Sequence, residues 1–341
     1  MIVVFTWPPS PIPVWNSAMS NKWHLSVLLL ALDFFLAIDA RDLTFYVSPN
    51  NGSDVENTGT SPSSPWATAS AATERISFYL SESAVTSVTL FLERDAIFIN
   101  DPLIIASPNS SATIKISAYG NTSLPRPLLQ QSRGLSNIGS SDDCIHIAAP
   151  ATKGLIVDNI HFSGCARGLV ISGNTMPTLK TANINISSNI FLDIRTPFLR
   201  YTPPNPLWSP AILLSGGNFE NVTVKNNIGV RCDVFFRSQG HVTNLNVDSN
   251  TVQQCSGNCY FLGAGQGLVL RNSVFLRDMS TRLFSYGTTD VIIGTVSGAN
   301  AVIDNDFNKR GEYQGGPDGC AFDFETSATG WENSQYNKSI S

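Results

Sequence analysis

Hydrophobic and polar residues alternate along short runs of this chain, and most of these runs lead into an asparagine. The runs recur from residue 155 onward, with no helical stretch between them. They are LIVDNIHF (155–162), INISSNIF (184–191), VTVKNNIG (222–229), LNVDSNTV (245–252), LVLRNSVF (268–275) and AVIDNDF (301–307). Alternation with a period of two is typical of strands, so the pattern predicts a repetitive all-β protein.

The spacing of the asparagines sets the length of the repeat. They are Asn159, Asn189, Asn227, Asn250, Asn272 and Asn305, and the shortest spacings are 22 and 23 residues. Such a repeat has no room for the helix of a βαβ crossover. We therefore predict a solenoid, in which each repeat forms one coil and its strands pair in parallel with the coils above and below. Asparagine tolerates a left-handed turn and can bond to its copy in the next coil, so these six residues should lie along one edge.

The residues before the repeats predict the beginning of the solenoid. Residues 45–72 contain a strand, a loop rich in Gly, Ser and Asn, and the start of a helix. Apolar residues of this helix fall on one face, which suits a cap over the open end of a core. We expect an N-terminal strand, loop and capping helix over 41–87 and a parallel β-helix over 88–341. Because no capping helix follows the last repeat, we also expect that C-terminal coils are missing.

Four segments near the N-terminus resemble a known group of proteins. YVSPNNGSD (46–54), GTSPSSPWAT (59–68), TIKISAYG (113–120) and PRP (125–127) look like the start of right-handed parallel β-helix proteins of the pectin-lyase-like superfamily. The resemblance runs from about Phe45 onward and implies that fold. It does not select an activity, because the superfamily includes lyases, hydrolases, esterases and binding proteins.

Charge and the N-terminal segment indicate where the protein acts. The chain has 341 residues and a net charge of −5 without long runs of one sign, which argues against nucleic acid as a partner. An apolar run between His24 and Ala40 follows Lys22 and predicts a secretory signal peptide within residues 1–40, with Met19 as a candidate start. A membrane anchor is the alternative if this run is not cleaved. Six glycosylation sequons agree with secretion to the extracellular space: Asn51, Asn109, Asn121, Asn185, Asn221 and Asn337.

Six cysteines permit disulfides in a secreted chain. Cys232 and Cys255 each follow a repeat asparagine by five residues, so they should lie on adjacent coils, about 4.8 Å apart. That separation allows a disulfide. A reduced pair facing the core explains the same positions. Cys144 and Cys165 are one coil apart but out of register, which makes their pairing the weaker expectation.

The segment GGPDGCAFDFE (315–325) carries the strongest candidate chemistry. If its two phenylalanines point inward, Asp323 and Glu325 emerge together on the outer face, about 6.6 Å apart along the strand. Asp318 can fold back beside them. Carboxylates at this separation serve glycosidases, and three of them can hold Ca²⁺, although no cofactor is required. Solvent-facing acids without a function are the alternative.

Aligning the second strand of each repeat predicts a binding surface beside these acids. The strands are GLVIS (168–172), DVFFR (233–237), CYFLG (259–263), RLFSY (282–286) and AFDFE (321–325). In this alignment Asp323 shares its outward column with Val170, Phe235, Phe261 and Phe284, and Glu325 shares its column with Arg237 and Tyr286. The pattern favours a sugar-binding stripe, whereas a register shifted by one residue would place the phenylalanines in the core. The inserted loop 195–210, with Tyr201 and Trp208, is expected to overhang the stripe.

The superfamily resemblance implies further candidates. In its lyases, Ca²⁺ neutralises a uronate carboxylate and an Arg or Lys removes a proton, which would suit Arg310, Lys309 or Arg237. SSDDCIHI (140–147) also resembles the Asp-Asp segment of polygalacturonases.

That second resemblance departs from its family at several points. Arg167 stands where the family has the histidine of a His-Gly pair, and the family's Asn-Thr-Asp and Arg-x-Lys segments are absent. We therefore expect a solvated turn at Asp142 and Asp143 and a surface strand position for His146.

These observations predict a secreted, carbohydrate-active β-helix, either a polysaccharide hydrolase or a lyase. A non-catalytic extracellular protein that binds carbohydrate or mediates adhesion on the same scaffold is the alternative.

Overall fold

The computed structural model describes residues 40–341 except 107–110, 133–142, 149–152, 174–178, 195–208, 254–259, 278–290, 297–301, 310–321, 325–334 and 341. For 260–264 and from 275 onward, only the backbone is described. The chain divides into two units, Met1–Ala40 and Arg41–Ser341. The predicted signal peptide thus lies almost wholly outside the described residues. Within the described part, no helix combines the length and apolarity needed to cross a membrane.

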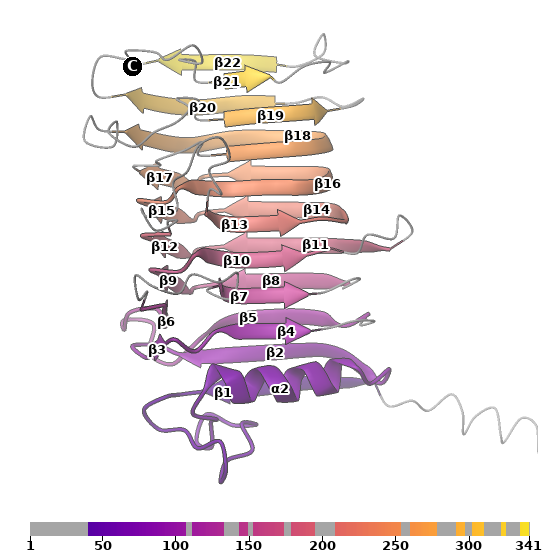
Figure 1. The fold of residues 1–341 in the computed structure, drawn as a ribbon, viewed down its shortest axis with the longest axis vertical. Helices are drawn as coiled ribbons and strands as arrows, with labels where there is room; N and C mark the ends of the chain where they lie inside the picture. Colours follow the sequence, from indigo (N-terminus) through magenta and orange to yellow (C-terminus); the bar gives the residue numbers. More distant parts are fainter. Residues whose placement is uncertain are drawn as a thin grey trace, which may run out of the picture. The chain divides into compact units, whose positions relative to one another are not determined.

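Arg41–Ser341 is a parallel β-helix, as the repeat predicts (Figure 1). Its strands form three stacks, which we name A, B and C in the order in which each coil visits them. Stack A contains β1 (Arg41–Val47), β2 (Val85–Glu93), β5 (Thr113–Tyr119), β8 (Gly154–Asp158), β11 (Lys180–Ser187), β14 (Asn218–Lys225), β20 (Val302–Lys309) and β22 (Gln335–Ile340).

The other two stacks are built from shorter strands. Stack B contains β3 (Ile97–Ile99), β6 (Leu128–Gln130), β9 (His161–Ser163), β12 (Ile190–Leu192), β15 (Ile228–Val230) and β17 (Thr251–Gln253). Stack C contains β4 (Leu103–Ala106), β7 (Asp143–Ala148), β10 (Arg167–Ser172), β13 (Pro210–Ser215), β19 (Val291–Val296) and β21 (Phe322–Phe324). The long strands β16 (Val234–Asp248) and β18 (Tyr260–Arg277) begin in stack C and continue into stack A, and β18 also reaches stack B.

The core is filled by alternate side chains that stack from coil to coil. One column of register partners in stack A is buried along its whole length: Phe45, Leu90, Ile116, Val157, Ile186, Val224, Val247 and Leu270. Burying an aliphatic or aromatic side chain contributes about 1.5–3 kcal/mol to folding. The alternation seen in the sequence is therefore the direct cause of the solenoid.

Helix α2 (Ala69–Leu80) closes the N-terminal end of the core (Figure 1). Its buried residues, Ala69, Ala72, Ile76 and Leu80, lie on the face that the sequence predicts. The side chain of Thr68 caps the helix by accepting a hydrogen bond from the backbone N–H of Ala71 at 3.1 Å. The carboxylate of Asp101 accepts the N–H groups of Ala69 and Ser70 at 2.6 and 3.0 Å. These acceptors satisfy backbone groups that a helix start leaves unpaired.

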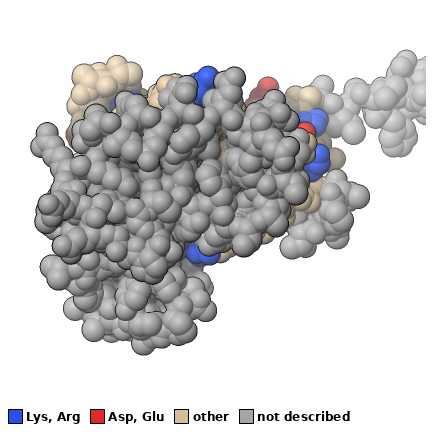
Figure 2. Space-filling view, turned by 90° about the horizontal axis from the view of Figure 1, so that it is seen from above, with Lys and Arg blue, Asp and Glu red and all other residues tan. Residues whose placement is uncertain are grey.

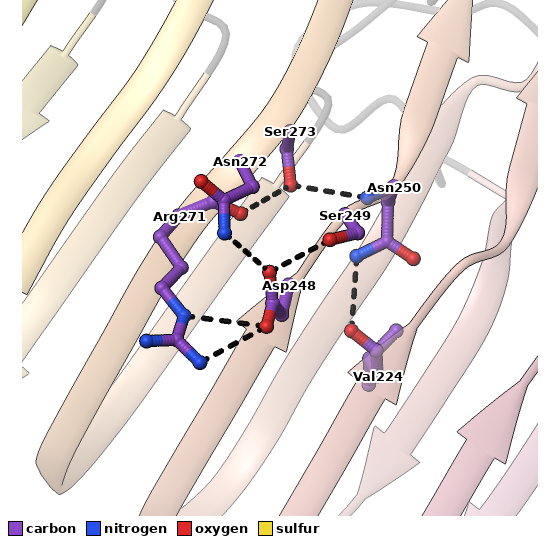
Figure 3. Close-up of polar contacts among 7 residues, drawn as sticks. All are labelled: Val224, Asp248, Ser249, Asn250, Arg271, Asn272 and Ser273. Carbon is purple, nitrogen blue, oxygen red and sulfur yellow. Dashed lines mark hydrogen bonds and ion pairs between the residues drawn. The ribbon is translucent and has the colours of Figure 1, made fainter.

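The repeat asparagines lie at the corner between stacks A and B, which confirms their expected common edge. Asn189, Asn227 and Asn250 are buried and form a ladder. Oδ1 of Asn227 accepts the backbone N–H of Asn189 at 2.9 Å, and Oδ1 of Asn250 accepts that of Asn227 at 3.1 Å. Asn250 also donates to the carbonyl oxygen of Val224 at 2.9 Å, and its own N–H contacts Oγ of Ser273 at 3.4 Å (Figure 3). The ladder thus supplies partners for backbone groups that the turn takes out of the strand pairing.

Two of the predicted asparagines occupy a different position of this corner. Asn159 and Asn272 have φ angles of 59° and 51°, and they share that left-handed position with Ser188, Asn226 and Ser249. The ladder position beside them is held by Ile160 and Ser273 instead. The two roles assigned to one asparagine are therefore divided between neighbouring residues. Asn305 lies in β20 at the same corner, between the residues paired with Arg271 and Val274.

The disulfide in the structure is the pairing that the sequence made the weaker expectation. Cys144 and Cys165 are bonded, with Cα atoms 5.8 Å apart. Cys165 lies in the corner before β10 rather than within a strand, so the strand register does not fix its position. Cys232 is buried, and its Sγ lies 3.7 Å from the carbonyl oxygen of Phe191. Cys255 lies outside the described residues, so its pairing with Cys232 stays a prediction.

Candidate functional site

The pairing of stack C aligns one outward column along the solenoid. Val170 pairs with His146 below it and with Leu213 above it, and Leu213 pairs with Arg237. The backbone register then continues the column to its far end: Phe261, Ile292 and Asp323. Neighbouring strands are about 4.8 Å apart, so Arg237 and Asp323 are separated by three strand spacings, about 14 Å. We name this column, from His146 to Asp323, the stack C column.

This register corrects part of the alignment made from the sequence. Arg237 lies in the same column as Asp323, not in the neighbouring one with Glu325 and Tyr286. The strand that occupies the coil between β18 and β21 is β19, whereas Phe284 and Tyr286 lie outside the described residues. Val170 and Phe261 share the column of Asp323, as predicted.

Phe235 is a core residue, as the alternative expectation holds, although the register is not shifted by one residue. It is fully buried and packs edge-on against Phe191 of stack B, with ring centroids 6.0 Å apart. Phe236, also buried, takes the register position opposite Ile212. Room for the Phe235 ring exists because residue 229 is glycine, where a Cβ would lie 2.4 Å from a ring carbon. The strand is therefore displaced by two residues relative to the sequence alignment, so that Arg237 and not Phe235 holds the position in the column of Val170.

Arg237 is a half-buried cation in the middle of the stack C column. Burial lowers the pKa of its guanidinium, which nevertheless stays charged because the ordinary value is so high. Leu213 and Val170, the next residues along the column, are buried. A guanidinium presents a planar fork of donors that matches a carboxylate or vicinal hydroxyl groups.

Asp143 is not in a solvated turn, contrary to the expectation from the sequence. It is the first residue of β7, and its side chain is 4% exposed. Arg167, its register partner on β10, donates from Nε to Oδ1 at 2.6 Å and from Nη2 to Oδ2 at 2.8 Å. This bidentate pair explains how a carboxylate can be buried there. Asp142 lies outside the described residues.

His146 stands between this carboxylate and a hydroxyl group. Its Nδ1 lies 3.4 Å from Oδ2 of Asp143, and its Nε2 lies 2.9 Å from Oγ of Ser172 on β10. Burial is the main cause that lowers the pKa of His146. Asp143 acts in the opposite direction, and Arg167 adds to the lowering. The imidazole is therefore neutral at neutral pH and can accept a proton.

The predicted acidic cluster and most of its companions fall where side chains are not described. Asp323 lies in β21, where only its backbone register is known. The following lie outside the described residues: Asp318, Glu325, Arg310, Tyr201 and Trp208. Their catalytic and Ca²⁺-binding roles stay predictions. Over the residues that were described, no group of three or more His, Cys, Asp or Glu is arranged to hold a metal.

The sequons occupy different surroundings. Asn51, Asn121 and Asn221 are exposed, whereas Asn185 is half-buried and its Oδ1 has no hydrogen-bond partner. Asn337 lies in β22 and Asn109 lies outside the described residues. Glycosylation stays a prediction for all six. In Figure 2, basic and acidic residues both lie near the rim of the view, without a broad patch of one sign on the described surface visible there.

Comparison with known proteins identifies no family. No family model matches the chain, and no curated protein matches it. Among solved structures it is similar to the GH136 lacto-N-biosidase from Eubacterium ramulus. The selenomethionine derivative is 12% identical with a TM-score of 0.35, and the match covers 86% of this chain and 68% of that one. The native form is 11% identical with a TM-score of 0.32, over 87% and 67%. At these values the similarity says nothing about activity.

Proposed function

We propose that this protein is a secreted carbohydrate-active β-helix that binds a glycan along the stack C column and cleaves it with carboxylates at the column's far end. Asp323, Asp318 and Glu325 are the proposed acids. The observation that supports the proposal is the backbone register of stack C, in which Arg237 and Asp323 hold corresponding strand positions.

A column of this kind suits a polymer better than a small molecule. Parallel coils repeat about every 4.8 Å, so the strands of stack C from Arg237 to Asp323 can meet successive parts of one extended chain. Arg237 offers a bidentate contact to a uronate carboxylate, which makes an acidic glycan the substrate class that we propose. The loop with Tyr201 and Trp208 is the proposed source of stacking contacts to sugar rings.

The proposed acids allow two reactions. As a pair of carboxylates, one protonates the leaving oxygen and the other attacks the sugar or activates water, which gives hydrolysis. If the acids held Ca²⁺, the ion would neutralise the carboxylate of a uronate and Arg310 would be the residue to remove the proton, which would give elimination. The product distinguishes the two, since only elimination leaves an unsaturated sugar.

The test is incubation of the full chain with a panel of acidic and neutral polysaccharides, with Ca²⁺ and with EDTA. We expect new reducing ends, or unsaturated product absorbing in the ultraviolet. The variant Asp323→Asn should lower the rate by about 100-fold or more, the usual contribution of a general acid or base. Asp42→Asn, which changes an exposed carboxylate on β1, is the matched control and should keep the full rate. Folded protein without either product would favour the non-catalytic binding protein, and full activity in Asp323→Asn would remove this site.

A further inference from the structure

A second cluster of side chains that are suited to catalysis lies at the other end of the stack C column. His146 and Asp143 are on β7 and Ser172 is on the neighbouring strand β10. The imidazole contacts the hydroxyl through Nε2 at 2.9 Å and faces the carboxylate through Nδ1 at 3.4 Å. We propose that Ser172, His146 and Asp143 form a hydrolytic site whose substrate is a carboxylic ester, with Ser172 as the nucleophile.

The order of the three groups fixes their roles. A carboxylate beside Nδ1 favours the tautomer that carries its proton there, which leaves Nε2 as an acceptor for the proton of Ser172. His146 is therefore the general base, and Asp143 is a positioning residue that acts through it. The 3.4 Å contact is longer than a usual hydrogen bond, as such contacts often are before substrate binds.

His146 is not needed to neutralise the buried carboxylate of Asp143. Arg167 already satisfies both oxygens of Asp143 with two charge-assisted hydrogen bonds. The imidazole is thus not needed as a counter-ion, and it directs its second nitrogen to a hydroxyl. A neutral histidine in this position also fits the direction in which burial moves its pKa.

The acid of this cluster is shielded from solvent, whereas the base and the nucleophile are partly exposed. The side chain of Asp143 is 4% exposed and that of His146 is 31% exposed. Ser172 is partly exposed on the outward face. A hydrolytic site of this kind requires a shielded acid, which holds the imidazole in place, and a hydroxyl that substrate can reach.

The reaction balances with water as the only co-reactant. Oγ of Ser172 attacks the ester carbonyl carbon and gives its proton to Nε2 of His146. The bond to the alcohol oxygen then breaks, and His146 returns the proton to that oxygen, leaving an acyl group on Ser172. Water attacks the acyl carbon with His146 again taking the proton, the carboxylic acid leaves, and the proton returns to Oγ.

This inference does not depend on the proposed glycan cleavage. It uses described side chains at the N-terminal end of the column, whereas the proposed cleavage uses acids at the other end. An ester assay on a small substrate can therefore fail while polysaccharide cleavage succeeds, and the reverse is also true.

The experiment uses the full chain, p-nitrophenyl acetate and a fluorophosphonate probe. We expect release of nitrophenol and covalent attachment of the probe to Ser172, located by mass spectrometry of peptides. Ser172→Ala should lower kcat by about a thousandfold or more and abolish labelling. Asp143→Asn should lower kcat with little change in KM, because it disturbs the tautomer and not the binding of the ester.

Ser215 provides a matched control. It pairs with Ser172 one coil further along and is also partly exposed, so Ser215→Ala should keep the wild-type rate and labelling. Failure of the folded wild-type protein to hydrolyse the ester and to take up the probe would overturn the proposal. Retention of the wild-type rate in Ser172→Ala would overturn it as well.

Discussion

At the scale of single residues, two neighbouring asparagines at the corner between stacks A and B have different structural roles. Asn226 has a φ of 54°, a conformation that non-glycine residues rarely adopt. Asn227 is fully buried, and its amide joins three coils. Its Oδ1 accepts from Asn189, and its Nδ2 donates to the carbonyl oxygen of Ile186 at 2.9 Å and to Oδ1 of Asn250 at 3.1 Å. The first position therefore selects for backbone conformation and the second for hydrogen bonding.

This difference predicts unequal effects of substitution. Asn227→Ala leaves buried donors and acceptors unpaired and should lower the free energy of unfolding by about 1–3 kcal/mol or more, since several partners are lost. Asn226→Gly should change it little, because glycine adopts positive φ without strain. Urea unfolding followed by circular dichroism measures both. Equal losses in the two variants would contradict the division of roles.

At the scale of elements, the Cys144–Cys165 disulfide joins β7 to the corner that precedes β10. The two cysteines are separated by 21 residues, which is one coil of the solenoid. The bond also lies next to the proposed ester site, since β7 carries Asp143 and His146 and β10 carries Ser172. It therefore holds together the two strands on which that site depends.

Removing this bond should destabilise the protein by a predictable amount. Closing a loop of about 20 residues restricts the unfolded chain by about 3 kcal/mol. We expect a loss of that order in the free energy of unfolding for the double variant Cys144→Ser, Cys165→Ser. Urea unfolding of the wild-type chain after reduction should give a similar loss. A reduced protein as stable as the oxidised one would show that the bond contributes nothing.

At the scale of the whole molecule, the free energy of unfolding depends on pH through two half-buried histidines, which lie in different stacks. Burial is the main cause that lowers the pKa of both His146 and His161, and in each case a nearby arginine lowers it further: Arg167 for His146 and Arg126 for His161. The unfolded chain therefore binds more protons than the folded one as the pH falls through 6.5 toward the folded-state pKa values. The free energy of unfolding should decrease over that window.

Urea unfolding at a series of pH values between 7.5 and 5 tests this dependence. His161→Gln removes one of the two groups and should make the decrease shallower. Identical slopes in the wild type and His161→Gln would exclude His161 as a source of the effect.

The sequence alone determined the architecture, because alternation and a repeat of about 22 residues are properties of the chain itself. The inward column from Phe45 to Leu270, the buried face of α2 and the common edge of the asparagines all follow from local pattern. The register of stack C, by contrast, depends on packing between distant parts of the chain. There the strand is displaced by two residues from the sequence alignment, and Phe235 packs against Phe191, a residue 44 positions earlier in the chain.

The tertiary structure also decided which polar groups meet. Sequence reasoning placed Asp143 in a solvated turn and gave Ser172 no role. Arg167 lies one coil beyond Asp143 in the sequence. It indicates an ion pair only when the strand register makes the two residues partners. His146 and Ser172 are 26 residues apart, and no local pattern requires their contact. Contacts between coils depend on the lengths of the corners and on how they pack, so the candidate ester site emerged only from the folded chain.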